Sequence, residues 1–231
     1  MQDYLLFIDT ETSGIPQDIN TKISHTDLWP FILQVAWCIY TSEGELLKSE
    51  NHYINEPDII IEEASQKIHN IDYELLKEKG ESRKEVIKIL ANDLRHYKPL
   101  IVGHFVEFDS KMLQVAFNRV GLKNIIKDLP HFCTMRSTGD YVRYTNRDYP
   151  SLGILYEGLF KEKLVKMHDA SADAEATAKC FFELYRKGEI DEELIENQPL
   201  FIKVRQEIRN KYGCGLPVVI LLIVGLIMIF S

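Results

Sequence analysis

The chain has 231 residues, of which 45% are hydrophobic, and its 27 Lys and Arg against 35 Asp and Glu give a net charge of −8. This length allows one domain with a sizeable core plus appendages, and the acidic balance argues against a broad basic nucleic-acid surface while leaving room for a local one. The four cysteines are far apart and form no C-x-x-C pair, which excludes a cysteine-based zinc site or a disulfide framework and suits a reducing compartment.

The first predicted element is a strand over residues 4–12. Its apolar run, residues 4–8, predicts a strand that is buried on both faces in the middle of a sheet. Residues i and i+2 of a strand face the same side, so Asp9 and Glu11 are expected to project together. Two carboxylates this close repel each other unless a cation lies between them, and a divalent metal ion is the natural candidate. The alternative is an ordinary turn after a strand.

The following pattern predicts a mixed α/β fold. Strands are expected at residues 31–40, 46–54, 100–104 and 131–135. Helices are expected at residues 64–70, 72–79, 82–97, 109–120, 151–159 and 170–187. Three antiparallel strands, followed by strands that alternate with helices, predict a mixed β-sheet with helices on its faces.

Two later segments carry further candidate residues. Asp109 follows the strand at 100–104 and is expected at a helix start, where an acid can also serve simply as a cap. His168 and Asp173 flank the start of the helix at 170–187, whose many alanines make it slim enough to lie close to a sheet. Asp173 can then approach the strand that carries Asp9. The alternatives are a surface histidine and a solvated first-turn acid.

Three segments together resemble the motifs of the DEDDh-type 3′–5′ exonucleases, which include the proofreading epsilon subunit of bacterial DNA polymerase III and ribonuclease T. The segments are Asp9-Thr10-Glu11-Thr12, Gly103-His104-Phe105-Val106-Glu107-Phe108-Asp109 and His168-x4-Asp173. The resemblance covers roughly residues 1–190 and implies a ribonuclease H-like fold. This chain departs from the family pattern at Phe105, where asparagine is usual, and at Gln34, where glutamate is frequent.

The resemblance also implies a chemistry. Four acids, with Glu107 as a rival for the third, would hold two divalent ions, Mg²⁺ or Mn²⁺: Asp9, Glu11, Asp109 and Asp173. His168 would act as the general base, and the products would be nucleoside 5′-monophosphates released from a single-stranded or frayed 3′ end. Residues expected to contact substrate are Thr10, Thr12, His104 and Phe105, although a histidine at the position of His104 is more often structural.

Other readings stay open at this stage. The same fold can be a catalytically silent nucleic-acid-binding or membrane-tethered scaffold, although all five catalytic positions are intact. An RNA-trimming exoribonuclease is a closer alternative, although DNA is the expected substrate. A polymerase or repair partner is open as well.

The C-terminal part has a different character. After an exonuclease domain at residues 1–190, we expect a linker at 191–212 that is basic near its end, then a transmembrane anchor at 213–231. Residues 216–230 contain no charged or strongly polar side chain, and basic residues precede this apolar segment. The start of the chain does not read as a signal peptide, so we expect a cytoplasmic catalytic domain at the inner face of a membrane.

Overall fold

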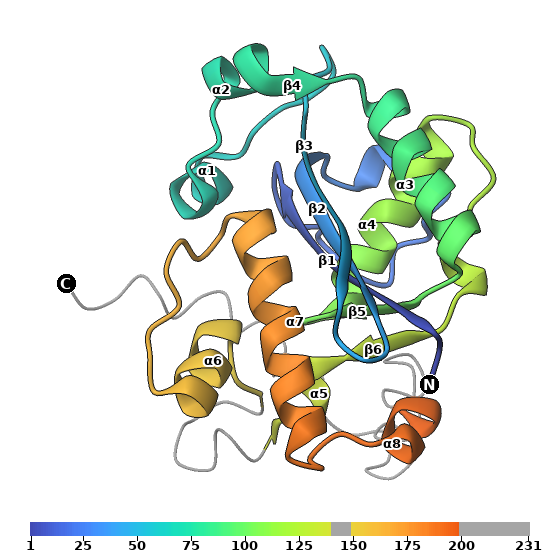
Figure 1. The fold of residues 1–231 in the computed structure, drawn as a ribbon. Helices are drawn as coiled ribbons and strands as arrows, with labels where there is room; N and C mark the ends of the chain where they lie inside the picture. Colours follow the sequence, from blue (N-terminus) through green and yellow to red (C-terminus); the bar gives the residue numbers. More distant parts are fainter. Residues whose placement is uncertain (140–148, 199–231) are drawn as a thin grey trace, which may run out of the picture. The chain divides into compact units, whose positions relative to one another are not determined.

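A computed structural model describes residues 1–139 and 149–198, in which a six-stranded mixed sheet carries helices on both faces (Figure 1). In the order of the sheet, the strands are β4 (Gly80–Glu81), β3 (Leu46–Ile54), β2 (Ile32–Thr41), β1 (Tyr4–Thr12), β5 (Leu100–Gly103) and β6 (His131–Cys133). The helices are α1 (Glu63–His69), α2 (Tyr73–Lys79), α3 (Arg83–Tyr97), α4 (Val106–Arg119), α5 (Thr134–Ser137), α6 (Leu152–Phe160), α7 (Ala170–Arg186) and α8 (Glu192–Asn197), with 3-10 turns at Thr26–Leu28 and Ile126–Asp128. The mixed α/β sheet predicted from the sequence is confirmed.

Strand β1 lies inside the sheet, antiparallel to β2 and parallel to β5. Leu5, Leu6 and Phe7 have no exposed surface, as the unbroken apolar run predicts for a strand covered on both faces. The polar end of β1 therefore emerges from a buried part of the sheet, and it stays paired with β2 beyond Phe7, the last residue of β1 that pairs with β5.

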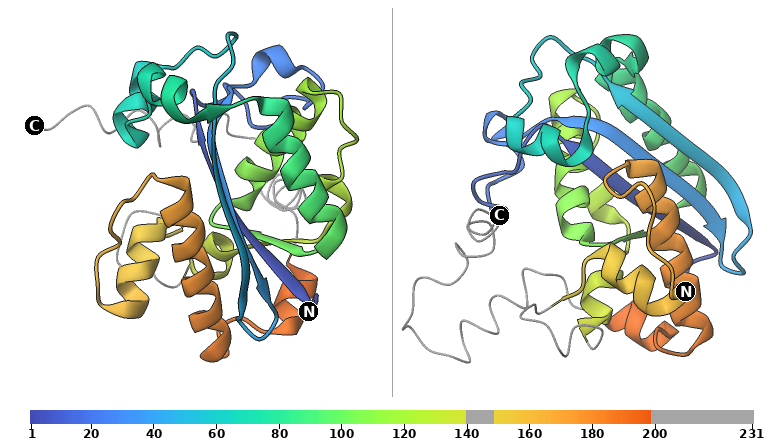
Figure 2. Two further views of the ribbon diagram at one scale, coloured as in Figure 1. Left: turned by 45° about the horizontal axis from the view of Figure 1, so that its top comes forward. Right: turned by 90° about the vertical axis from the view of Figure 1, so that its left-hand side faces the viewer.

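Helices cover the two faces of the sheet in pairs, α6 with α7 on one and α3 with α4 on the other (Figure 2). On the first face, Phe7 packs edge-on against Phe181 of α7, with 5.5 Å between the ring centroids. The predicted close approach of the slim helix to the sheet is confirmed, because α7 packs on β1 and β2 with Ala174 and Ala178 buried.

Several boundaries differ from the sequence prediction. Helix α4 begins at Val106, so Asp109 lies inside its first turn and does not precede the helix. Strand β6 ends at Cys133 because the chain turns at once into α5. The two-residue strand β4, which pairs in parallel with the end of β3, was not predicted because it is too short to show a pattern.

Helix α8 lies within the segment where a linker is expected from residue 191 onward. Ile190 and Ile195 are 1% and 7% exposed and belong to the apolar cluster that includes Phe181 and Leu184. The amino group of Met1 also pairs with the Glu192 carboxylate at 3.2 Å. Although this segment is rich in acidic residues, its two isoleucines face the core. The compact unit of the chain accordingly extends over Met1–Glu196.

The predicted anchor at 213–231 and the basic part of the linker lie outside the described residues, as do residues 140–148. Within residues 1–139 and 149–198, no helix is both long enough and apolar enough to cross a membrane.

The packing of α8 yields a stability test. Replacing the buried Ile195 by Ala should lower the free energy of unfolding by about 2 kcal/mol or more, because it removes core contacts and leaves a cavity. The matched change at the neighbouring Leu194, which is 36% exposed, should cost much less. Denaturant unfolding of both variants measures the difference. Equal losses would mean that α8 does not contribute to the core.

Candidate active site

The site is built at the carboxyl end of β1. The pleat of the strand turns Asp9 and Glu11 to the same face as Leu5 and Phe7, which is the face that α7 covers. Glu11 lies directly opposite Gln34 of β2 in the strand register. The i, i+2 spacing therefore directs both carboxylates toward the start of α7.

Asp109 reaches the site from α4, on the opposite face of the sheet. The Thr10 hydroxyl, which points to that face, donates a hydrogen bond of 2.7 Å to Asp109 Oδ1. The rival acid Glu107 is held elsewhere, because its carboxylate accepts a 2.6 Å hydrogen bond from Lys111 Nζ. Of the two acids in the second motif, the structure therefore brings Asp109 to the cluster.

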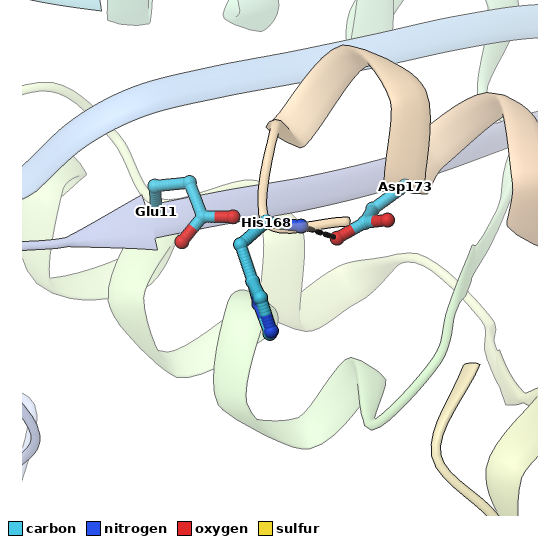
Figure 3. A group of neighbouring side chains, drawn as sticks. All are labelled: Glu11, His168 and Asp173. Carbon is cyan, nitrogen blue, oxygen red and sulfur yellow. Dashed lines mark hydrogen bonds between the residues drawn. The ribbon is translucent and has the colours of Figure 1, made fainter. Parts of the chain in front are cut away.

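Asp173 and His168 come from the start of α7 (Figure 3). Asp173 Oδ2 accepts a 2.9 Å hydrogen bond from the backbone N–H of His168, which fixes the preceding loop to the first helical turn. His168 has φ of +64°, an uncommon conformation for a residue with a β-carbon, and its side chain is exposed. Its imidazole and the carboxylates of Glu11 and Asp173 each offer a ligand atom within 4.8 Å of the others.

The electrostatics of the cluster confirm that the acids crowd one another. Burial, followed by the charges of Asp109, Asp173 and Glu11, raises the pKa of Asp9 well above its usual range. Burial and the nearby carboxylates of Asp173 and Asp109 raise the pKa of Glu11 to about 8. Burial also raises the pKa of Asp109 to about 7, although the hydrogen bond from Thr10 opposes the shift. The pKa of Asp173 is raised as well, chiefly by burial.

These residues fit a divalent cation. Asp173 Oδ1 is buried and accepts no hydrogen bond within the described part of the chain. Buried polar atoms are normally satisfied, and a cation provides a partner for this one and relief of the repulsion between the acids. Carboxylate oxygens are the ligands that hard cations such as Mg²⁺ prefer.

The other expected substrate contacts are placed around this cluster. His104 is half-buried, and its ring nitrogens lie 3.0 Å from the Thr134 hydroxyl and 3.0 Å from the Pro150 carbonyl oxygen; burial lowers its pKa to about 4. The Thr12 hydroxyl donates to the Gly14 carbonyl at 2.7 Å. Phe105 is the N-cap residue just before α4, with φ of +80°; its side chain is 37% exposed and stacks on Phe108. Phe105 therefore offers an accessible side chain, whereas His104 and Thr12 bond within the protein.

Sequence reasoning missed Asp169. Its Oδ1 caps α7 by accepting the Ala172 N–H at 3.1 Å, and its charge also raises the pKa of Asp9 and of Glu11 after larger effects such as burial. Its place directly between His168 and a helix start is a sequence signal for an N-cap that could have identified it.

The raised pKa of Glu11 predicts how the metal-free stability depends on pH. From the ordinary value of 4.5 up to about 8, folded Glu11 binds more protons than unfolded Glu11, so its contribution to stability is present at low pH and is lost as the pH rises. Thermal unfolding in EDTA across this window, compared with a Glu11→Gln variant, isolates this contribution. The thermal stability of the wild type relative to the variant should fall as the pH rises. Added Mg²⁺ should raise the stability of the wild type most at the upper end of this pH window. A relative stability that does not change with pH would contradict the assignment.

Comparison with known proteins agrees with this geometry. A family model described as "Exonuclease" matches residues 6–181. No curated protein sequence matches the chain. Among solved structures, a zinc-bound complex of E. coli exonuclease I with single-stranded DNA is similar, with a TM-score of 0.63 and 21% identity over 81% of this chain and 41% of that one. E. coli exonuclease I bound to a dA16 oligonucleotide is also similar, with a TM-score of 0.62 and 20% identity over 80% of this chain and 41% of that one.

The chain thus spans less than half of the exonuclease I chains that it resembles, and the low identity makes this a likeness of fold. The family match is broader, because it contains all three predicted motifs and most of the compact unit. On this evidence the resemblance to the DEDDh-type exonucleases is confirmed, and the chain belongs to the exonuclease family.

Proposed function

We propose that the protein is a metal-dependent 3′–5′ exonuclease that removes nucleoside 5′-monophosphates from the 3′ end of single-stranded DNA. The observation that carries the proposal is the convergence of four acids and one histidine, from β1, α4 and the start of α7, at one edge of the sheet. The preference for DNA is supported by the similar exonuclease I structures, which are complexes with single-stranded DNA and with a dA16 oligonucleotide.

The four acids, Asp9, Glu11, Asp109 and Asp173, are the proposed ligands of two divalent ions, Mg²⁺ or Mn²⁺. When bound, such ions stabilise the charge that develops on the attacking and leaving oxygens of a displacement at phosphorus. The protein supplies the fixed carboxylates. Thr10 orients Asp109, and the His168 N–H orients Asp173, so neither ligand has to be ordered when substrate arrives.

His168 is the proposed general base. It accepts a proton from the attacking water as the new P–O bond forms, while the bond to the 3′-oxygen of the preceding nucleotide breaks. Histidine suits this step because an imidazole takes up and releases a proton near neutral pH. Its side chain is exposed beside Glu11 and Asp173, while its backbone is held by Asp173, so it is both accessible and positioned.

The exposed ring of Phe105 is the proposed contact for the base of the terminal nucleotide. Aromatic stacking on a base tolerates every base, as expected for an exonuclease that removes nucleotides in succession. Its conformation with φ of +80° supports a functional role, because a bulky residue adopts it only at a cost.

The direct test uses oligonucleotides labelled at the 5′ end. With Mg²⁺ or Mn²⁺, products should shorten stepwise from the 3′ end, DNA should be degraded faster than RNA, and EDTA or Asp9→Ala should abolish the reaction. Faster loss of RNA would favour the exoribonuclease alternative, and an inactive wild type would favour a silent scaffold.

Replacing His168 by Ala should slow hydrolysis by about 10²–10⁴-fold, the range for loss of a general base, with partial recovery at higher pH. Mn²⁺ affinity, measured by calorimetry, should change little. Because the imidazole lies within ligand distance of Glu11 and Asp173, a large loss of Mn²⁺ affinity would instead assign His168 as a ligand.

The apolar segment at 216–230 supports a separate proposal, attachment to a membrane with the catalytic domain on the cytoplasmic side. Together with the uncharged residues 213–215, this apolar segment approaches the length of about 20 residues that a membrane span needs. The basic residues that precede the span fit a position on the cytoplasmic side of the membrane. The full chain should sediment with membranes and require detergent, whereas deletion of residues 213–231 should release an active enzyme. Full-length protein that stays soluble without detergent would contradict the anchor.

A further inference from the structure

Gln34 connects the sheet to the beginning of α7. Its side chain is 1% exposed and lies on β2 directly opposite Glu11 of β1. The amide nitrogen donates to Asn51 Oδ1 at 2.9 Å and makes a longer contact, 3.5 Å, to Asp169 Oδ2. The amide oxygen accepts the backbone N–H of Ala170 at 3.3 Å.

These contacts reach the two residues that begin α7. Asp169 is the N-cap, Ala170 is the first helical residue, and His168 immediately precedes both. Asp173 lies in the first turn of α7, and its Oδ2 accepts a hydrogen bond from the backbone N–H of His168. A shift of the helix start relative to β2 would therefore move the proposed base and one proposed metal ligand away from Glu11 together.

The neutral amide suits this position for an electrostatic reason. Asp169 Oδ2 needs a donor, whereas the Ala170 N–H needs an acceptor, and one buried amide provides both. A carboxylate here would keep the acceptor but lose the donor, and its charge would face Asp169 in a cluster that already holds several acids. A hydrocarbon side chain of similar size would lose both bonds.

We infer that Gln34 is a positioning residue: through Asp169 and Ala170 it fixes the start of α7 so that His168 and Asp173 face Glu11. This inference rests on the proposed nuclease function of the same site. Strand β2 would then help to set the geometry of the active site, although none of its residues is a proposed metal ligand.

The test is a charge-matched exchange. Gln34→Leu removes the connection without adding charge. Gln34→Glu leaves two hydrogen-bond acceptors facing each other, and Asp169→Asn leaves two donors facing each other. The double variant Gln34→Glu/Asp169→Asn restores a donor opposite an acceptor with roles reversed, keeps an acceptor for the Ala170 N–H, and has the net charge of the wild type. Gln2→Glu, at an exposed residue, controls for one added negative charge.

Four quantities are measured. The kcat and KM on a single-stranded DNA oligonucleotide and the Mn²⁺ affinity by calorimetry are determined well below the unfolding temperature, and the thermal midpoint is determined separately. Gln34→Leu and the two single exchanges should each lower kcat by about tenfold, typical of directly coupled groups, with little change in KM. Gln34→Leu should also weaken Mn²⁺ binding, because Asp173 is no longer held near Glu11. The double variant should recover both quantities to within about threefold of the wild type.

Two results would overturn the inference. One is wild-type kcat and Mn²⁺ affinity in Gln34→Leu, with a lowered thermal midpoint, which would assign Gln34 to stability alone. The other is a double variant as impaired as the single exchanges. If the wild type has no nuclease activity, the proposed function fails, and the Mn²⁺ affinities of the charge-matched variants still decide whether Gln34 positions Asp173.

Discussion

The repulsion among buried carboxylates at the end of β1 is the constraint on which the rest of the site depends. Asp9, Glu11, Asp109 and Asp173 come from three elements, and each has its pKa raised by burial. Folding brings them together against their mutual repulsion, so the surrounding structure has to hold them there. A stable protein can keep such a cluster only when packing elsewhere offsets its cost, and a bound cation reduces that cost directly.

The architecture provides that support from both faces of the sheet. Phe7 and the alanines of α7 allow the helix to approach β1 closely, which brings Asp173 beside Glu11. On the other face, the Thr10 hydroxyl connects β1 to Asp109 of α4 with a short hydrogen bond. Because side chains alternate along a strand, Asp9 and Glu11 face α7, whereas Thr10 faces the opposite side and holds Asp109 of α4.

Much of this arrangement follows from local patterns in the sequence. The apolar run before Asp9 specifies a central strand, and the spacing of Asp9 and Glu11 specifies their common face, because both depend only on neighbouring residues. The choice between Glu107 and Asp109 could not be made from composition, since either acid fits a first helical turn; the pairing of Glu107 with Lys111 separates them.

The approach of α7 to β1 is predicted from the sequence, but other contacts between residues distant in sequence could not be predicted from local patterns. Gln34 meets Asp169 across more than a hundred residues, and nothing near either residue indicates the contact. Helix α8 was read as linker because its acidic residues outweigh Ile195 in composition, although that isoleucine is what places the helix on the core. Long-range packing determined both outcomes, whereas strand and helix periodicity determined the elements predicted correctly.

The central claim, that the acid cluster is a divalent-cation site, is tested most directly by the protons released when Mn²⁺ binds. Calorimetric titrations near neutral pH, in buffers with different ionisation enthalpies, measure this number. Glu11 and Asp109, whose pKa values are about 8 and about 7, are partly protonated there and have to lose their protons to act as ligands. Mn²⁺ should bind with net release of protons, and this binding should be lost in Asp9→Ala. Binding without proton release, or unchanged binding in that variant, would contradict it.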